Sequence, residues 1–126
     1  MISSSEMAEA ANPLEPLVAA LRAFALEREW DQFHTPKNLA SALSVEAAEL
    51  LEHFQWLTEA QSKLLDADKK TKVAAEAADV FLYLLQLCDK LDIDLIAAAH
   101  SKLVANGEKY PVDKSRGTSK KYSDLL

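Results

Sequence analysis

Residues 35–54 read TPKNLASALSVEAAELLEHF, and this stretch decides the fold. It opens with Thr35 and Pro36, a typical helix start, because threonine caps free backbone N–H groups and proline suits the first helical position. Apolar side chains then recur every three or four residues, which predicts a helix of about five turns with one buried face. They are Leu39, Ala42, Leu43, Ala47, Leu50, Leu51 and Phe54.

The stretch before it predicts a first helix. Asn12 is a suitable cap, the proline after it suits the first helical position, and Glu15 would complete a capping box. The helix is expected to close over residues 28–33. A second capping box, Thr58 with Gln61, predicts a short helical turn further along the chain. The buried face of the first helix is expected to consist of Leu14, Leu17, Val18, Leu21, Phe24 and Ala25.

The stretch after it predicts two more long helices. Apolar periodicity places a third helix at about residues 72–91. The charged stretch 66–72 is either a solvated connection or the start of that helix. Acidic caps at 92–94 predict a fourth helix that runs to about Lys109 and ends before Pro111.

The chain is acidic and poor in glycine. It has 126 residues, 49% of them apolar, and 20 acidic against 14 basic side chains give a net charge of −6. Because its two glycines are Gly107 and Gly117, a glycine-rich phosphate loop or dinucleotide-binding turn cannot be built earlier in the chain. The charge argues against a nucleic acid polymer as partner. The lone Cys88 is expected to be a buried, reduced thiol.

These patterns predict an all-α protein, a four-helix antiparallel bundle joined by short loops. We expect a disordered leader at residues 1–11, one domain at 12–110 and a polar, basic tail at 111–126. No stretch has the pattern of a signal peptide or of a membrane span. A cytoplasmic protein without a membrane partner is therefore expected.

Two acidic pairs interrupt the apolar helices, Glu46-x-x-Glu49 and Glu76-x-x-Asp79. Residues three apart lie on the same side of a helix, so the four carboxylates converge if the two helices pack side by side. Such a cluster repels itself unless cations neutralise it, and oxygen ligands suit Mg²⁺, with Mn²⁺ as a substitute. Asp79 lies in an apolar run and is expected to be little exposed, which favours a metal site over a solvated acidic face.

A di-iron site is the other metal hypothesis. Di-iron bundles use Glu-x-x-His on two helices. Here His53 lies four residues after Glu49, and the predicted third helix contains no histidine. Magnesium therefore ranks above iron.

Aromatic and basic side chains share helix faces with these acids. Trp56 lies seven residues after Glu49, and Tyr83 seven after Glu76, which returns each to nearly the same face of its helix. An aromatic platform, carboxylates and a basic stripe together suit a nucleoside triphosphate. The basic and polar stripe of the fourth helix consists of Lys102, Asn106 and Lys109.

These side chains also have structural explanations. Trp30 and Trp56 could pack the ends of the bundle, Tyr83 could belong to the core, and lysines on helices usually face solvent. In an antiparallel pair Trp56 and Tyr83 would project to opposite ends of the acidic cluster. One substrate would then reach both only if a second subunit or the first helix completes the site. His34, in the turn before the second helix, could reach either a substrate or a helix end.

Several linked motifs resemble the MazG-like nucleotide pyrophosphohydrolases, and more specifically their dCTP pyrophosphatase branch. The likeness covers residues 14–125, and the two acidic pairs on separate helices carry it at the level of the family. The branch is indicated by EWDQFH at 29–34, FQW at 54–56, DVFLYL at 79–84 and KLVANGEKYP at 102–111.

The resemblance implies Mg²⁺-dependent hydrolysis of a nucleoside triphosphate, with dCTP or a related deoxynucleotide as substrate, to the monophosphate and pyrophosphate. It also implies a homodimer or a homotetramer built from two dimers, with sites near subunit interfaces. The implied metal-binding and catalytic residues are Glu46, Glu49, Glu76 and Asp79. The base and sugar would contact Trp30, His34, Asn38 and Trp56, and the sugar or phosphates would contact Tyr83, Lys102, Asn106 and Lys109.

Two rival functions fit the same patterns. A non-catalytic helical interaction module would explain the amphipathic helices, although it does not explain acids at matched spacing on two of them. A dimeric dUTPase or a phosphoribosyl-ATP pyrophosphohydrolase would share the acidic cluster and differ in the pocket. Dependence on divalent cations and a comparison of nucleotides separate these alternatives.

Overall fold

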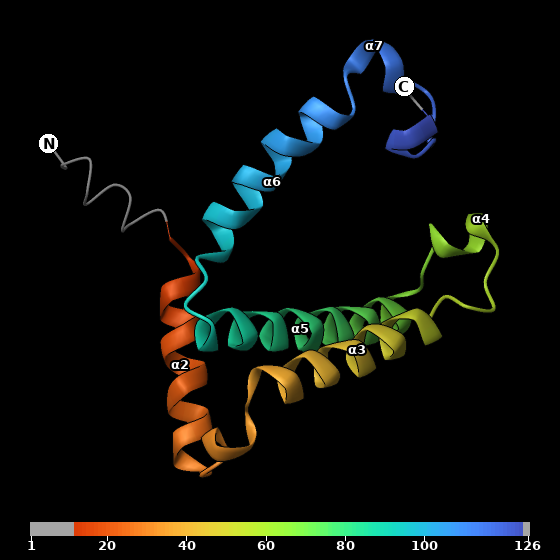
Figure 1. The fold of residues 1–126 in the computed structure, drawn as a ribbon. Helices are drawn as coiled ribbons and strands as arrows, with labels where there is room; N and C mark the ends of the chain where they lie inside the picture. Colours follow the sequence, from red (N-terminus) through yellow and green to blue (C-terminus); the bar gives the residue numbers. More distant parts are fainter. Residues whose placement is uncertain (1–11, 125–126) are drawn as a thin grey trace, which may run out of the picture. The chain divides into compact units, whose positions relative to one another are not determined.

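The computed structural model describes residues 12–124, and every regular element in that range is a helix (Figure 1). The four long helices predicted from the sequence are present, which confirms an all-α protein. The predicted leader, residues 1–11, lies outside the described part. The elements are α2 (Leu14–Glu27), η1 (Asp31–Phe33), α3 (Pro36–Glu52), α4 (Glu59–Ser62), α5 (Ala67–Lys90), α6 (Leu95–Lys109), α7 (Val112–Ser115) and η2 (Tyr122–Asp124).

The chain divides into two compact units between Asp92 and Ile93. The first unit contains α2, η1, α3, α4 and α5, and the second contains α6, α7 and η2. Within residues 12–124, no helix combines the length and the apolar character that crossing a bilayer requires.

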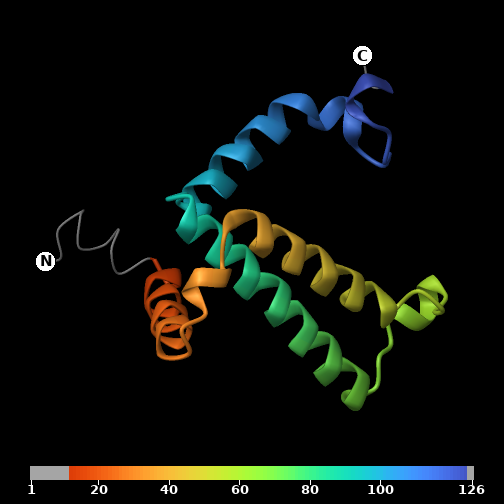
Figure 2. The same ribbon diagram turned by 60° about the horizontal axis from the view of Figure 1, so that its bottom comes forward.

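The first unit is built on the α3–α5 pair. These helices lie side by side and run in opposite directions (Figure 1 and Figure 2). Leu39, near the start of α3, and Leu85, near the end of α5, are 1% and 2% exposed and lie at the same end of the pair. Burying a leucine side chain contributes about 2 kcal/mol. Together with Ala25 of α2 and Cys88 of α5, these leucines are the buried apolar residues of the described chain.

Cap residues define where the long helices begin, as predicted. The Thr35 hydroxyl accepts from the Asn38 N–H at 3.2 Å, and Pro36 occupies the first turn of α3. The Asp94 carboxylate accepts from the Ala97 N–H at 3.0 Å at the start of α6. Each cap satisfies a backbone donor that the first helical turn leaves free.

The capping box of α4 is complete. The Gln61 N–H donates to the Thr58 hydroxyl at 3.1 Å, and the Thr58 N–H donates to the Gln61 side chain at 2.9 Å. At the first helix Asn12 provides a cap, but the predicted box is not formed. The Leu14 N–H donates to Asn12 Oδ1 at 3.1 Å, whereas no bond from the Asn12 N–H to Glu15 occurs in the described residues.

Two helical segments differ from the sequence-based expectation. Helix α5 begins at Ala67, five residues before the expected start, because Asp66 Oδ1 accepts from the Lys69 N–H at 2.7 Å. The charged stretch that follows therefore forms the first turns of the helix, which confirms one of the two interpretations given for it. The expected polar tail contains the short helices α7 and η2. The sequence did not predict them, because the tail has no apolar periodicity.

Candidate active site

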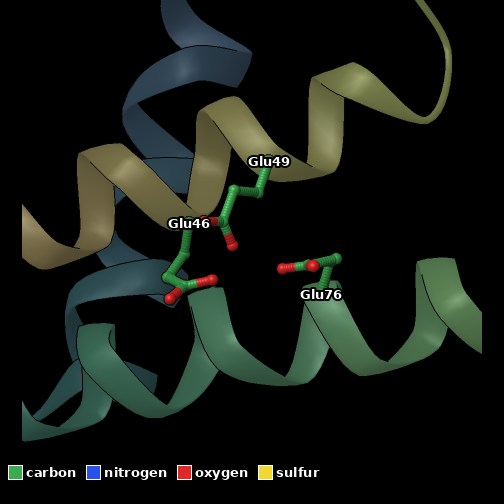
Figure 3. Close-up of side chains that lie close together, drawn as sticks. All are labelled: Glu46, Glu49 and Glu76. Carbon is green, nitrogen blue, oxygen red and sulfur yellow. The ribbon is translucent and has the colours of Figure 1, made fainter.

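Three glutamates from two helices lie close together in the middle of the α3–α5 pair. Glu46 and Glu49 point from α3 toward Glu76 on α5 (Figure 3). Each offers one carboxylate oxygen, and these oxygens all lie within 4.8 Å of one another. The spacing of three residues places Glu46 and Glu49 on the same side of α3, and the antiparallel packing brings Glu76 opposite to them.

The electrostatics of this acidic cluster are unfavourable without a cation. Burial, followed by the neighbouring carboxyl groups of Glu49, Glu76 and Asp79, raises the pKa of Glu46 to about 7. Glu46 Oε2 and Glu76 Oε2 are buried and have no hydrogen-bond partner. Buried charges need a partner, and oxygen ligands suit a hard divalent cation. The acidic cluster therefore has the composition and spacing of a metal site.

Asp79 does not match the environment expected for it. Its side chain is exposed rather than covered, so the expectation that Asp79 is little exposed was wrong. The neighbouring Ala77 and Ala78 are exposed as well, because small apolar side chains fit an uncovered helix face as easily as a core. Asp79 nevertheless lies close enough to act on the pKa of Glu46.

A pocket of about 370 Å³ lies beside the acidic cluster, between α2 and α5. Most of its wall is apolar or aromatic, which is typical of small-molecule sites. It brings together four residues predicted from the sequence, Trp30, His34, Asp79 and Tyr83. The remaining lining residues are Leu17, Ala20, Leu21, Phe24, Leu82 and Gln86.

A specific helix end positions Trp30 in this pocket. The Glu29 N–H donates to the Leu26 carbonyl at 3.1 Å, and the Trp30 N–H donates to the Ala25 carbonyl at 2.9 Å. This is the Schellman arrangement, and it requires left-handed backbone at Glu29, where φ is 56°. The Trp30 ring then meets the Phe24 ring edge-on, with 5.8 Å between their centroids.

Two ion pairs hold the pocket walls against α5. The Arg22 guanidinium of α2 binds the Asp89 carboxylate through two nitrogens, with Nε to Oδ2 at 2.8 Å. Lys90 pairs with Asp31 of η1, in the segment between Trp30 and His34. Arg22 lowers the pKa of Asp89 through this hydrogen bond. The two pairs thus link α2 and η1, which border the pocket, to the end of α5.

Other predicted contact residues do not line this pocket. Trp56 is 87% exposed, beyond the end of α3. The Asn38 amide donates to the Phe33 carbonyl at 2.9 Å and so ties the start of α3 to η1. Lys102, Asn106 and Lys109 lie on α6, in the second unit, where the Lys109 ammonium stands 5.3 Å from the centre of the Tyr122 ring. Their contacts with a substrate stay predictions.

Gln86 is the pocket residue whose sequence signal was overlooked. It interrupts the apolar run from Leu84 to Cys88, just as the acids interrupt theirs. It also lies seven residues after Asp79, which returns it to nearly the same face of α5. Leu17, Ala20 and Leu82 carry no such signal, because an apolar residue that lines a pocket has the same pattern as one in a core.

The model of the MazG-like family matches residues 41–125. That range includes the acidic cluster, whereas Trp30, His34 and Asn38 precede it. Curated relatives include dCTP pyrophosphatase 1 of Rattus norvegicus, Mus musculus and Homo sapiens, which are 41%, 42% and 39% identical over 104 residues. The match covers 81% of this chain and 61% of each relative, so the chain spans about three fifths of their length.

A solved structure shares the fold. It is the crystal structure of a pyrophosphatase from Archaeoglobus fulgidus DSM 4304, with 44% sequence identity and a TM-score of 0.74. The similarity covers 78% of this chain and 92% of that one. It therefore extends over nearly the whole of the archaeal chain.

Proposed function

The chain belongs to the MazG-like family, and we propose that it is a Mg²⁺-dependent nucleoside triphosphate pyrophosphohydrolase. Its substrate in this proposal is dCTP or a related deoxynucleotide, which it converts to the monophosphate and pyrophosphate. The observation that carries the proposal is the acidic cluster of Glu46, Glu49 and Glu76 beside an aromatic pocket. The dCTP pyrophosphatases among its relatives support this choice of substrate.

The metal-binding part of the proposal concerns the carboxylates. Glu46, Glu49 and Glu76 would hold Mg²⁺, or Mn²⁺ as a substitute, and Asp79 would join them from the edge of the pocket. When bound, the cation neutralises phosphate charge and lowers the pKa of the attacking water. One carboxylate of this set accepts the proton that the water loses as it attacks the α-phosphorus and pyrophosphate leaves.

The pocket part of the proposal concerns the nucleoside. Trp30 offers an aromatic face to the base, and Tyr83 lies between the base and the carboxylates. His34 can donate or accept a hydrogen bond at the pocket wall. Asn38 and Trp56 would complete the base and sugar contacts. Phosphate contacts would come from Lys102, Asn106 and Lys109, whose positive and polar groups offset the net charge of −6.

The partner in this proposal is a second copy of the chain, as a homodimer or homotetramer in the cytoplasm, and not a nucleic acid polymer or a membrane. Its support is the number of large apolar side chains that are exposed in the described part of one chain. Trp56 is 87% and Leu64 85% exposed, and Phe33 and Leu51 are each 60% exposed. Association of two copies would cover such surface and would bring a second Trp56 within reach of a site.

A panel assay tests the proposed activity. Release of pyrophosphate from each canonical dNTP, from dUTP and from phosphoribosyl-ATP is measured with Mg²⁺ and with excess EDTA. We expect turnover of dCTP that is lost in EDTA and restored by Mg²⁺. A preference for dUTP or phosphoribosyl-ATP would point to the related enzymes. Absence of turnover for the whole panel would contradict the proposal and favour a non-catalytic module.

A further inference from the structure

Gln86 is a polar pocket residue that the proposed function has not used. It lies on α5 between the buried side chains Leu85 and Cys88, and it lines the pocket with Asp79 and Tyr83. Two helical turns, about 10 Å along the axis, separate it from Asp79. Along α5 it therefore marks the end of the pocket away from the carboxylates, where the base of a bound nucleotide would lie.

The orientation of the Gln86 amide is fixed by its own helix. Gln86 Nε2 donates to the Leu82 carbonyl oxygen at 3.2 Å. A carbonyl oxygen can only accept, so turning the amide over would set two acceptors against each other. No donor in residues 12–124 is paired with Gln86 Oε1. At Oε1 the side chain therefore presents an unused acceptor, and a donor cannot take that position without loss of the bond to Leu82. The second N–H of Nε2 is a separate donor.

We propose that Gln86 is a specificity-determining residue that selects a pyrimidine with an amino group at position 4 over one with an oxygen there. This inference rests on the function proposed above. The 4-amino group of cytosine can donate to Oε1, whereas the 4-oxo group of uracil would bring two oxygens together. A site with a fixed polar group rejects a ligand that leaves that group unpaired.

The apolar pocket residues and His34 do not make this distinction. Leu21, Phe24 and Leu82 contact an amino and an oxo group equally well, because the two differ little in size. The His34 ring can present either a donor or an acceptor, depending on which nitrogen carries the proton. Gln86 is the member of the wall whose hydrogen-bonding direction is fixed by a neighbouring carbonyl.

The test compares dCTP with dUTP as substrates of the full chain in Mg²⁺. We expect the wild type to have the higher kcat/KM for dCTP. Gln86→Leu should reduce the ratio of the two kcat/KM values by about tenfold or more, through a higher KM for dCTP. Its kcat/KM for dUTP should be unchanged or higher, and this retained turnover also shows that the variant folds.

Thr71→Val is the matched control. Thr71 lies on the same helix, and its hydroxyl donates to the Ala67 carbonyl at 2.9 Å, again four residues back. It does not line the pocket. Its substitution should leave the ratio of dCTP to dUTP unchanged. A change equal to that in Gln86→Leu would mean that helix perturbation, and not base contact, sets the ratio, which would overturn the inference.

A binding measurement separates this inference from the proposed activity. Calorimetric titration with dCMP and dUMP in Mg²⁺ should show tighter binding of dCMP to the wild type and similar binding of both to Gln86→Leu. If dCTP is hydrolysed and Gln86→Leu keeps the full preference, base selection by Gln86 is wrong while the activity stands. If nothing is hydrolysed but dCMP binds in preference through Gln86, the activity is wrong and the selection stands. If nothing is hydrolysed and neither monophosphate binds, both are wrong.

Discussion

Glu46 has the most perturbed environment among the carboxylates of the site. Burial and three neighbouring acids raise its pKa to about 7, so about half of the molecules carry it protonated at neutral pH when no cation is bound. A bound cation competes with that proton, since metal ligands must be deprotonated. At high pH the charged Glu46 side chain therefore destabilises the folded chain when no cation is bound. When a cation is bound, the same charge stabilises the folded chain.

This gives a pH dependence of stability with a defined sign. The folded pKa of Glu46 is above its usual value of 4.5, so the folded chain binds this proton more tightly than the unfolded chain. In EDTA, the contribution of Glu46 to the free energy of unfolding is present below about pH 4.5 and is lost as the pH rises through about 7. Urea unfolding at a series of pH values across this range measures how the free energy of unfolding changes.

The control for that measurement is Glu46→Gln, which should flatten the decline with pH. Asp89 does not interfere, because its pKa is lowered from 3.8, so its contribution is present above that value and is lost only in more acidic solution. Saturating Mg²⁺ should also remove the decline. A free energy of unfolding that rises between about pH 4.5 and 7 in EDTA would contradict the assignment.

Neutralising single carboxylates tests the catalytic assignment. Glu49→Gln and Asp79→Asn should each reduce Mg²⁺-dependent pyrophosphate release by about two orders of magnitude or more, because each removes a charged oxygen ligand. The helical circular dichroism spectrum should not change. Glu52→Gln, an exposed glutamate one turn further along α3, is the matched control and should keep wild-type turnover. Near wild-type turnover in either site variant would show that its carboxylate is not required.

At the scale of helices, side-chain caps define most of the starts in the first unit. Thr35, Thr58 and Asp66 each accept a hydrogen bond from a backbone N–H three residues later. Positive φ at Glu29 and Asp92, each just beyond a helix, shows that the chain makes left-handed helix ends without glycine. The helix that carries two of the site glutamates thus begins at a defined residue.

Removing the cap of α3 should cost stability without removing the site. Thr35→Ala deletes the acceptor of the Asn38 N–H and should lower the free energy of unfolding by about 1 kcal/mol. Ser41→Ala removes only a hydroxyl that bonds back to the Lys37 carbonyl on the exposed side of α3, and it should have a smaller effect. Chemical denaturation of both variants at one pH makes the comparison. An equal loss in the two variants would argue against a special role for the cap.

Features set by local chemistry could be predicted from the sequence, and features set by packing could not. The caps at Thr35 and Asp94 depend on residues three apart, so their patterns are visible in the chain. The convergence of Glu46, Glu49 and Glu76 could be predicted from their spacing, on the assumption that the two helices pack side by side. The exposure of Asp79 was predicted wrongly, because the alanines beside it do not reveal whether another element covers that face.

At the scale of the molecule, the described chain buries few of its large apolar side chains. Folded chains of this length bury roughly two-thirds of the surface that their unfolded state exposes. Here Trp56, Leu64 and Leu103 are all more than two-thirds exposed. Large exposed apolar side chains usually mark surfaces that meet a partner, which agrees with the oligomer proposed above.

The mass of the protein in solution tests this. Light scattering during size-exclusion chromatography should give at least twice the 13.9 kDa of one chain. Because apolar burial drives such association, the assembly should persist at high ionic strength. A monomer at micromolar concentration would contradict the proposed oligomer without bearing on the acidic cluster.

The order of features along the α3–α5 pair has a consequence for folding kinetics. Contacts nearest the link between the helices close the shortest loops and have the smallest entropic cost. The glutamates lie between that link and the buried end, where Leu39 and Leu85 are found. If α3 and α5 pair first next to this link and then along their length, the glutamate carboxylates must come together before the apolar core forms. Divalent cations would act on the height of this barrier and so on the rate of refolding, in addition to any part they take in hydrolysis.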